Sequence, residues 1–224
     1  MKHSACLSLL TLASFAFAGS ASAALVASYS FTSNLSSGDS QGSSVASAIQ
    51  SGGGLGTQDT SWGRSGGQSD LYIRGNMTET VAQPDDYAFF TVAITPGTTY
   101  DFTNLTFKHS IQIASGATAP FNSTIIVRSS LDGYASALGT FQLGSDVAGG
   151  PYTAPVNPSV DLAAYTGVSG TVEFRFYIQD DGDHTNNVTR IDDIQLNANV
   201  IPEPASGVML LGAGALAAFR RRRR

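Results

Sequence analysis

Two acidic clusters in the last third of the chain carry residue types that bind hard cations. Asp181 and Asp183 lie in a stretch rich in carboxylate and amide groups, and Asp192 and Asp193 follow shortly after it. Because calcium prefers such oxygen ligands, these four aspartates are candidate ligands of a structural calcium ion. The EF-hand spacing is not met, since Gly182 follows Asp181 directly. A solvated surface loop is the alternative interpretation.

No group of residues in the sequence predicts catalysis. Residues 63–67 satisfy the G-x-S-x-G pattern, but a nucleophile elbow needs a strand before the serine and a helix after it, and this stretch is rich in Gly and Ser. Glycosidases need two facing carboxylates, and Glu79 and Glu173 are the only glutamates between the two ends of the chain. We therefore expect no catalytic residues, no enzyme activity and no required cofactor.

Aromatic side chains offer the chain a way to bind carbohydrate, because the C–H faces of sugar rings pack on aromatic rings. Any single aromatic residue is more often a core or rim residue than part of a binding surface. The ligand-binding residues therefore stay unassigned. The candidates are Trp62, Tyr72, Tyr87, Tyr134, Tyr152 and Tyr177.

The charge of the chain is distributed unevenly. Its 12 basic and 17 acidic residues give a net charge of −5, but Lys2 and the five C-terminal arginines supply half of the basic residues. The region between them has six basic residues against all 17 acidic ones, a net charge of −11. Nucleic acids bind proteins through clustered cations, so this composition argues against a nucleic acid partner.

Residues 1–23 have the pattern of a secretory signal peptide. Lys2 provides the positive start, residues 7–18 form a short apolar run, and residues 21–23 (Ala-Ser-Ala) form a small-x-small cleavage site. The mature chain is expected to begin at Ala24, after export by the Sec machinery and cleavage by signal peptidase. The one cysteine, Cys6, is removed with this segment, so the mature fold must be stable without disulfides.

The C-terminal residues 200–224 have the composition of a short membrane-retained tail. Pro202, Glu203 and Pro204 precede an uncharged segment, residues 205–219, which as a helix would reach about 22 Å, short of the roughly 30 Å hydrocarbon core. The two prolines keep the backbone around Glu203 extended. Basic residues resist crossing the membrane and fix its C-terminal end in the cytoplasm. They are Arg220, Arg221, Arg222, Arg223 and Arg224.

This arrangement of Pro-Glu-Pro, apolar helix and arginine cluster resembles the PEP-CTERM sorting signal of Gram-negative bacteria. The same tail is sometimes catalogued as an ice-binding protein C-terminal region. The resemblance implies recognition by an exosortase, a membrane transpeptidase, and an association with exopolysaccharide and biofilm production. It implies a protein held transiently at the inner membrane with its domain on the periplasmic side, and finally placed at the cell surface or outside the cell.

The region between the two ends, residues 24–199, has a dominant period of two. Residues 171–178 place Val172, Phe174, Phe176 and Ile178 on one face of a half-buried strand. Turn residues separate the candidate strands, and no stretch has an amphipathic helical pattern. The sequence predicts an all-β fold, a single β-sandwich of jelly-roll or galactose-binding-like type. The other candidate strands are residues 25–31, 45–49, 71–74, 87–94, 100–107, 110–114, 123–129, 139–143 and 188–198.

The last candidate strand predicts a β-bulge. Asp192 shares the inward parity of Ile194 and Leu196, whereas Ile191 does not, so burying Ile191 requires an extra residue in the strand. This segment and residues 128–134 and 173–177 look like those of PEP-CTERM surface proteins with a jelly-roll domain. The segment with Asp192 also looks like the final strand of galactose-binding-like carbohydrate-binding modules.

The hypothesis that accounts for most of these features is an exported, non-enzymatic surface or matrix protein, delivered through its C-terminal tail, with an extracellular polysaccharide as a candidate partner. A carbohydrate-binding module or a polysaccharide-active enzyme of jelly-roll fold is the alternative.

Overall fold

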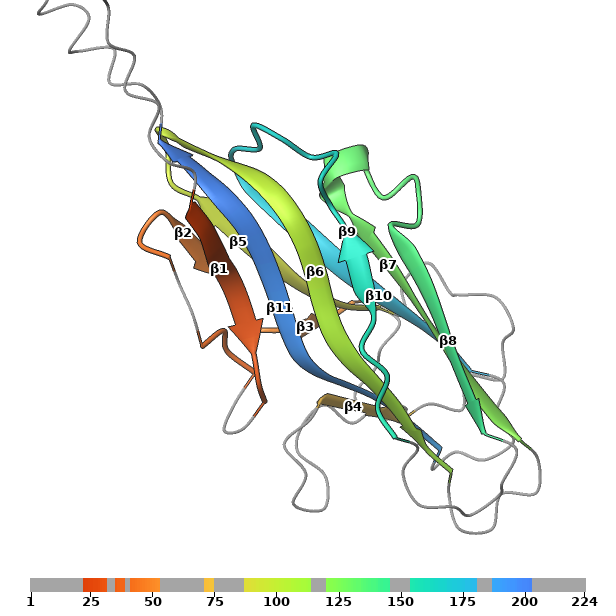
Figure 1. The fold of residues 1–224 in the computed structure, drawn as a ribbon. Helices are drawn as coiled ribbons and strands as arrows, with labels where there is room; N and C mark the ends of the chain where they lie inside the picture. The colour runs from red at the N-terminus through yellow and green to blue at the C-terminus, as the bar shows by residue number, and fades with distance from the viewer. Residues whose placement is uncertain are drawn as a thin grey trace, which may run out of the picture.

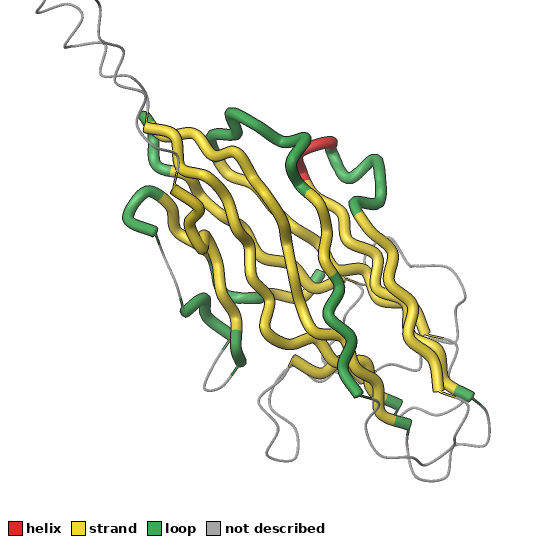
Figure 2. Tube along the Cα trace, viewed as in Figure 1, coloured by secondary structure: helices red, strands yellow, loops and turns green. Residues whose placement is uncertain are grey.

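The computed structural model describes residues 22–31, 35–38, 41–52, 71–74, 87–113, 120–145, 154–180 and 187–202. These residues form two antiparallel β-sheets packed face to face (Figures 1 and 2). The helical element in these ranges is one short 3-10 turn, η1 (Ser130–Asp132). The structure confirms the predicted all-β sandwich.

The first sheet has the strand order β1-β11-β6-β9, and β4 pairs with β11 beside it. The second has the order β2-β5-β10-β7-β8, and β3 pairs with β5. We call them the front and back sheets, as they appear in Figure 1. The strands are β1 (Ser22–Tyr29), β2 (Ser44–Ala46), β3 (Gln50–Ser51), β4 (Leu71–Arg74), β5 (Tyr87–Ile94), β6 (Thr98–Gln112), β7 (Phe121–Ser129), β8 (Gly139–Ser145), β9 (Ser159–Asp161), β10 (Thr171–Asp180) and β11 (Val188–Pro202).

The strand order is that of a jelly roll. The front sheet takes β1, β6, β9 and β11, and the back sheet takes β5, β7, β8 and β10, so the chain passes repeatedly from one sheet to the other. The middle of each sheet therefore pairs strands that are distant in sequence, such as β6 with β11 and β5 with β10. Two interleaved Greek keys of this kind define the jelly-roll class.

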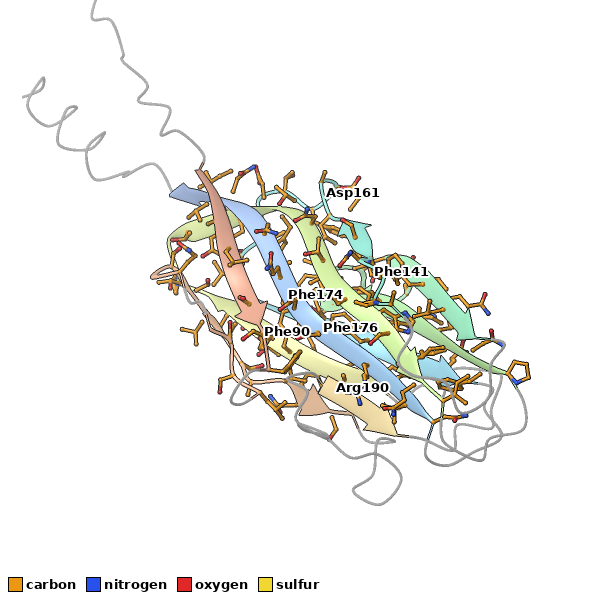
Figure 3. All side chains as sticks on the ribbon, turned by 60° about the horizontal axis from the view of Figure 1, so that its bottom comes forward. Phe90, Phe141, Asp161, Phe174, Phe176 and Arg190 are labelled. Atoms are coloured by element: carbon orange, nitrogen blue, oxygen red, sulfur yellow. The ribbon has the colours of Figure 1, made fainter. Side chains whose placement is uncertain are left out.

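Aromatic rings from both sheets meet in the core. Phe174 in β10 stacks on Phe90 in β5 with ring centroids 5.5 Å apart, and it meets Phe102 of the front sheet edge to face at 5.9 Å. Phe176 meets Phe107 of the front sheet edge to face at 5.3 Å. The labelled rings of Phe90, Phe174 and Phe176 lie together between the sheets in Figure 3. The alternation predicted for residues 171–178 is thus confirmed.

Bulges allow the two longest strands to curve together. The pairing of β11 with β6 shifts register between Asp192 and Gln195 and again between Asn197 and Ala198. Asp193 has a φ of 46°, and Ile191 and Ile194 on its two sides are both fully buried. The extra residue predicted from the parity of Asp192 is therefore confirmed.

The strand prediction was wrong at several places, of which β6 and β9 are the clearest. Residues 100–107 and 110–114 were expected as two strands, but β6 runs unbroken through Lys108 and His109, because His109 is buried and continues the inward alternation. The short edge strand β9 was not expected. Three residues carry too little periodicity to be recognised, and β9 forms by pairing with the middle of β6.

Strands β1 and β11 bring the two ends of the domain together. Ser22 pairs with Val200 and Ala24 with Ala198, so the start of β1 and the end of β11 lie at the same end of the sandwich (upper left in Figure 1). β11 continues to Pro202, which pairs with Thr98. The strand therefore runs directly into the Pro-Glu-Pro sequence. Most of the predicted signal peptide lies outside the described residues, which begin with Ser22 and Ala23, and residues 203–224 lie outside them too.

Replacing Phe174 by Ala should lower the free energy of unfolding by about 3–5 kcal/mol, because the cavity would remove ring contacts to both sheets at once. Urea denaturation followed by tryptophan fluorescence or circular dichroism measures the change. Phe89→Ala is the matched control, since Phe89 is half-buried on the opposite side of the same sheet. Equal losses for the two variants would contradict the assignment of Phe174 to the core.

Candidate functional site

Three of the six candidate aromatic residues meet on the outer face of the back sheet. Tyr87 in β5 and Tyr177 in β10 are register partners, and their ring centroids lie 5.0 Å apart. Tyr134, from the turn after β7, joins them through Arg175. Trp62 and Tyr152 lie outside the described residues, and the side chain of Tyr72 is not described.

Two arginines hold this cluster together. Arg175 lies between two tyrosine rings, with its guanidinium carbon 3.6 Å from the ring centroid of Tyr134 and 4.3 Å from that of Tyr87. Arg128 is the register partner of Arg175 and lies 5.7 Å from the ring centroid of Tyr177. Guanidinium groups are attracted to aromatic faces at these distances. We call Tyr87, Arg128, Tyr134, Arg175 and Tyr177 the arginine–tyrosine patch.

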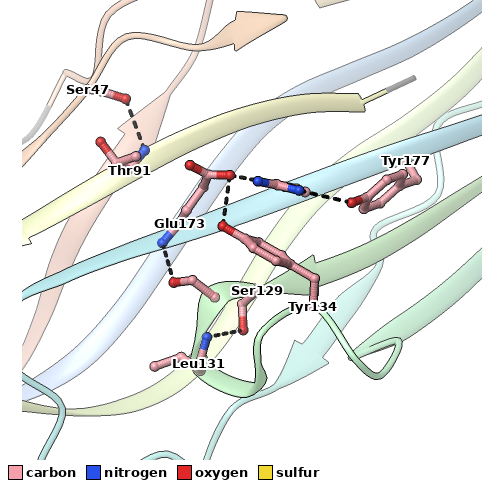
Figure 4. A network of polar contacts seen from close by, with 9 residues as sticks. Ser47, Thr91, Ser129, Leu131, Tyr134, Glu173 and Tyr177 are labelled. Atoms are coloured by element: carbon pink, nitrogen blue, oxygen red, sulfur yellow. Dashed lines mark hydrogen bonds and ion pairs between the residues drawn. The ribbon is translucent and has the colours of Figure 1, made fainter. Parts of the chain in front are cut away.

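Glu173 fixes the position of both Arg175 and Tyr134 (Figure 4). Its Oε1 accepts hydrogen bonds from Arg175 Nε at 2.5 Å and from the Tyr134 hydroxyl at 2.9 Å. Arg175 also donates to the Tyr177 hydroxyl at 3.4 Å. Burial opposes the charge of Arg175, but the hydrogen bonds to Tyr177 and Glu173 outweigh it and raise the pKa of the guanidinium. Burial, followed by the Glu173 contact, also raises the pKa of Tyr134.

The turn after β7 places Tyr134 over β10. The Ser129 hydroxyl accepts a hydrogen bond from Leu131 N at 3.3 Å and so caps η1, while the Ser130 hydroxyl accepts one from Glu173 N at 2.9 Å. Gly133 and Tyr134 both have positive φ angles, 68° and 63°, which reverse the chain. Glycine adopts this conformation readily, and for tyrosine it is uncommon.

The sequence pattern alone does not bring these residues together. The period of two in residues 171–178 leaves Glu173, Arg175 and Tyr177 on the face opposite Phe174 and Phe176, and residues 128–134 are a separate segment of the chain. The structure shows that these two segments form a single cluster, in which Arg128 donates to the Tyr134 carbonyl oxygen at 2.9 Å. The pairing of β7 with β10 creates the contact, and a period-two pattern carries no information about which strands pair.

Of the four aspartates considered as calcium ligands, Asp192 and Asp193 lie within the described residues. Asp193 forms an ion pair with Lys108, and its backbone N donates to Asp192 Oδ1 at 2.8 Å. The hydrogen bond and charge of Asp193 raise the pKa of Lys108. Within the described ranges, no three His, Cys, Asp or Glu residues group as a metal site would require. Asp181 and Asp183 lie outside those ranges, so the calcium site stays a prediction.

A buried polar cluster lies between the sheets at His109. Its Nε2 lies 3.3 Å from the Ser123 hydroxyl, which also accepts a hydrogen bond from Thr189 Oγ1 at 2.7 Å. All three residues are at most 1% exposed. Burial lowers the pKa of His109 to about 4, so the ring is neutral at pH 7. A histidine sealed from solvent in this way cannot reach a substrate, and its role is structural.

The architecture and the outer patch together define an all-β, jelly-roll domain with a solvent-accessible aromatic and cationic surface on one sheet. Comparison with known proteins identifies the tail more specifically. Residues 200–224 match the family described as the PEP-CTERM protein-sorting motif, so the chain carries that motif and is an exported protein targeted to an exosortase and held transiently at the membrane. No curated protein sequence matches the chain.

Several solved structures are similar to the domain. The K3 cleaved adhesin domain of Lys-gingipain from Porphyromonas gingivalis is 16% identical, with a TM-score of 0.44 over 77% of this chain and 98% of that one. TmCBM27, a carbohydrate-binding module with specific mannan recognition, is 13% identical, with a TM-score of 0.43 over 80% and 99%. The CBM22-1 xylan-binding domain from Paenibacillus barcinonensis is 13% identical, with a TM-score of 0.37 over 83% and 99%.

The sorting motif itself begins at the edge of the described structure. Val200, Ile201 and Pro202 belong to β11, and Glu203, Pro204 and residues 205–224 lie outside the described residues. Among the residues that are described, no helix has the length and apolar character that crossing a membrane requires.

The burial of His109 predicts a loss of stability in mild acid. The unfolded chain binds a proton at His109 below about pH 6.5, whereas the folded chain does so only near pH 4. Stability should therefore fall as the pH drops from 6.5 to 4, by up to about 3 kcal/mol from this group. Urea denaturation at several pH values measures the slope. In His109→Gln, whose side chain does not titrate, that part of the slope should vanish, and an unchanged slope would contradict the assignment.

The calcium prediction is tested by its effect on thermal stability. If Asp181, Asp183, Asp192 and Asp193 bind the ion, EDTA should lower the melting temperature of the purified protein by several degrees, and added calcium should restore it. Asp183→Asn should lose most of that response. The control is Asp161→Asn in β9 of the front sheet, outside the four predicted ligands. An EDTA-insensitive melting temperature would remove the calcium site.

Proposed function

We propose that the protein is a non-enzymatic component of the bacterial cell surface or extracellular matrix, delivered by exosortase processing of its C-terminal tail and acting in association with exopolysaccharide. The observation that carries this proposal is the PEP-CTERM motif, residues 200–224, which begins within the last strand of the jelly roll. Since the first three residues of the motif belong to β11, processing of the tail releases or attaches the whole domain.

The position of the two chain ends supports this route. Because Ala24, the expected first residue of the mature chain, pairs with Ala198, the start of the mature domain and its C-terminal tail lie at the same end of the sandwich. While the tail is in the membrane, that end faces the membrane. The exposed faces of both sheets then stay free for contacts outside the cell, as a surface or matrix role requires.

The described side chains support a binding role over a catalytic one. The histidine of the domain core is buried and neutral, and Glu173 is engaged by Arg175 and Tyr134. Glu173 is thus held as a positioning group, and it lacks a second carboxylate facing it among the described residues of β5, β7 and β10. General acid–base hydrolysis of a glycoside needs such a pair.

Processing of the tail is tested by mass spectrometry of the protein recovered from the cell surface and the medium. We expect an N-terminus at Ala24 and no peptide that contains Arg220 to Arg224. Replacing Pro202, Glu203 and Pro204 by alanine should leave the tail intact and the protein in the inner membrane fraction. Ala205→Ser, one residue beyond the motif, is the control and should be processed normally. An intact C-terminus in surface material from the unmodified chain would contradict the proposal.

A further inference from the structure

The arginine–tyrosine patch concentrates positive charge on a protein that is otherwise acidic. Of the basic residues whose side chains are described, Lys108 pairs with Asp193 and Arg190 is 2% exposed. Arg128 and Arg175 are instead register partners on the outer face of the back sheet. Glu173 is the acidic residue that faces outward beside them in the described parts of β5, β7 and β10. The patch therefore carries a net positive charge.

Both arginines keep donors that the fold does not use. In the described structure Arg175 donates through Nε to Glu173 and through Nη1 to Tyr177, while Arg128 donates through Nη1 to the Tyr134 carbonyl. This leaves Nη2 of Arg175, and Nε and Nη2 of Arg128, for an external acceptor. Guanidinium donors arranged in this way match the geometry of a carboxylate.

The surroundings of the arginines are suited to sugar rings. Tyr87 and Tyr134 are partly exposed on either side of Arg175, and Phe89 pairs with Arg175 from the neighbouring strand. Farther along the same face, Gln179 pairs with Thr124, and Thr124 with Gln142, which places amides and hydroxyls in the adjacent row. Three strands span roughly 10 Å at about 4.8 Å per strand, which is about the length of a disaccharide.

We propose that the arginine–tyrosine patch binds an acidic polysaccharide, with uronate carboxylates at Arg128 and Arg175 and pyranose rings against Tyr87 and Tyr134. The inference rests on the proposed surface role, and it names the ligand class and the site. An extended polymer can run across several neighbouring strands of this outer face. The patch alternates a cation with a ring, as such a polymer alternates a carboxylate with a sugar ring.

The net charge of the domain does not prevent this binding. At physiological ionic strength charges are screened beyond roughly 8 Å, so the acidic residues of the front sheet contribute little at the patch. Because of the same screening, charges far from the patch cannot add to its two arginines. This argues against a nucleic acid ligand, whose binding depends on many cations along a regular array of phosphates. Two arginines suffice for a ligand with one carboxylate per sugar unit.

The test compares polygalacturonate with its methyl ester, which keeps the sugar rings and removes the charge. The full chain, exported with its own signal peptide and purified, is titrated with each polymer by calorimetry or affinity electrophoresis. We expect binding to the acid that weakens with added salt, and at least about tenfold weaker binding to the ester.

Variants locate the site. Arg128→Gln should weaken binding of polygalacturonate about tenfold, because it removes one of the two guanidinium groups. Tyr87→Leu, which keeps an apolar side chain in the strand, should also weaken binding of polygalacturonate. This second variant tests the site independently if Arg128→Gln lowers the melting temperature of the protein. Lys108→Gln is the matched control, since it removes one positive charge from the front sheet and should leave binding unchanged.

Three results overturn the inference: no binding of either polymer, equal binding of the acid and the ester, or equal loss in Lys108→Gln and Arg128→Gln. Processing of the C-terminal tail is measured separately by mass spectrometry. A normally processed protein that fails to bind would reject the acidic glycan ligand while leaving the proposed delivery to the surface in place.

Discussion

The contact between the two sheets through phenylalanine rings is the interaction on which the rest of the molecule depends. The chain has one cysteine, in its predicted signal peptide, so no disulfide ties the mature sheets together. Phe174 and Phe176 in the middle of the back sheet meet Phe102 and Phe107 in the middle of the front sheet. These rings bury large apolar areas in edge-to-face geometry, which favours one relative placement of the sheets.

That internal packing determines what appears on the outside. A strand has a period of two, so a register that buries Phe174 and Phe176 must turn Glu173, Arg175 and Tyr177 outward. The neighbouring strands are fixed by the same core, with Phe90 in β5 and Val127 in β7 directed inward. Arg128 must then lie beside Arg175. The patch is thus a consequence of the core, and a change of register by one residue in β10 would eliminate it.

The sequence predicted those parts of the structure that depend on local alternation. Residues 71–74 and 87–94 were predicted as strands with the limits that β4 and β5 have, and parity alone predicted the bulge at Asp193. What could not be predicted was pairing. Tyr134 follows a turn and has no alternation to place it. Its contact with Arg175 exists because β7 and β10, whose paired residues lie 45 to 57 positions apart, are neighbours in the back sheet. Likewise β9 exists because β6 offers it an edge.

The pairing of β1 with β11 links folding of the domain to its maturation. If signal peptidase cuts after Ala23, it cuts a bond inside β1, where Ala23 and Ala24 pair with Asn199 and Ala198. A protease needs its substrate backbone extended and free, and a strand paired in a sheet is extended but not free. Cleavage must therefore precede the pairing of these residues. The pairing itself cannot occur before β11 has left the export machinery.

At the other end, Pro202 is the last residue of β11 and pairs with Thr98, and proline donates no hydrogen bond there. The sheet thus ends at Pro202, the first residue of the Pro-Glu-Pro sequence.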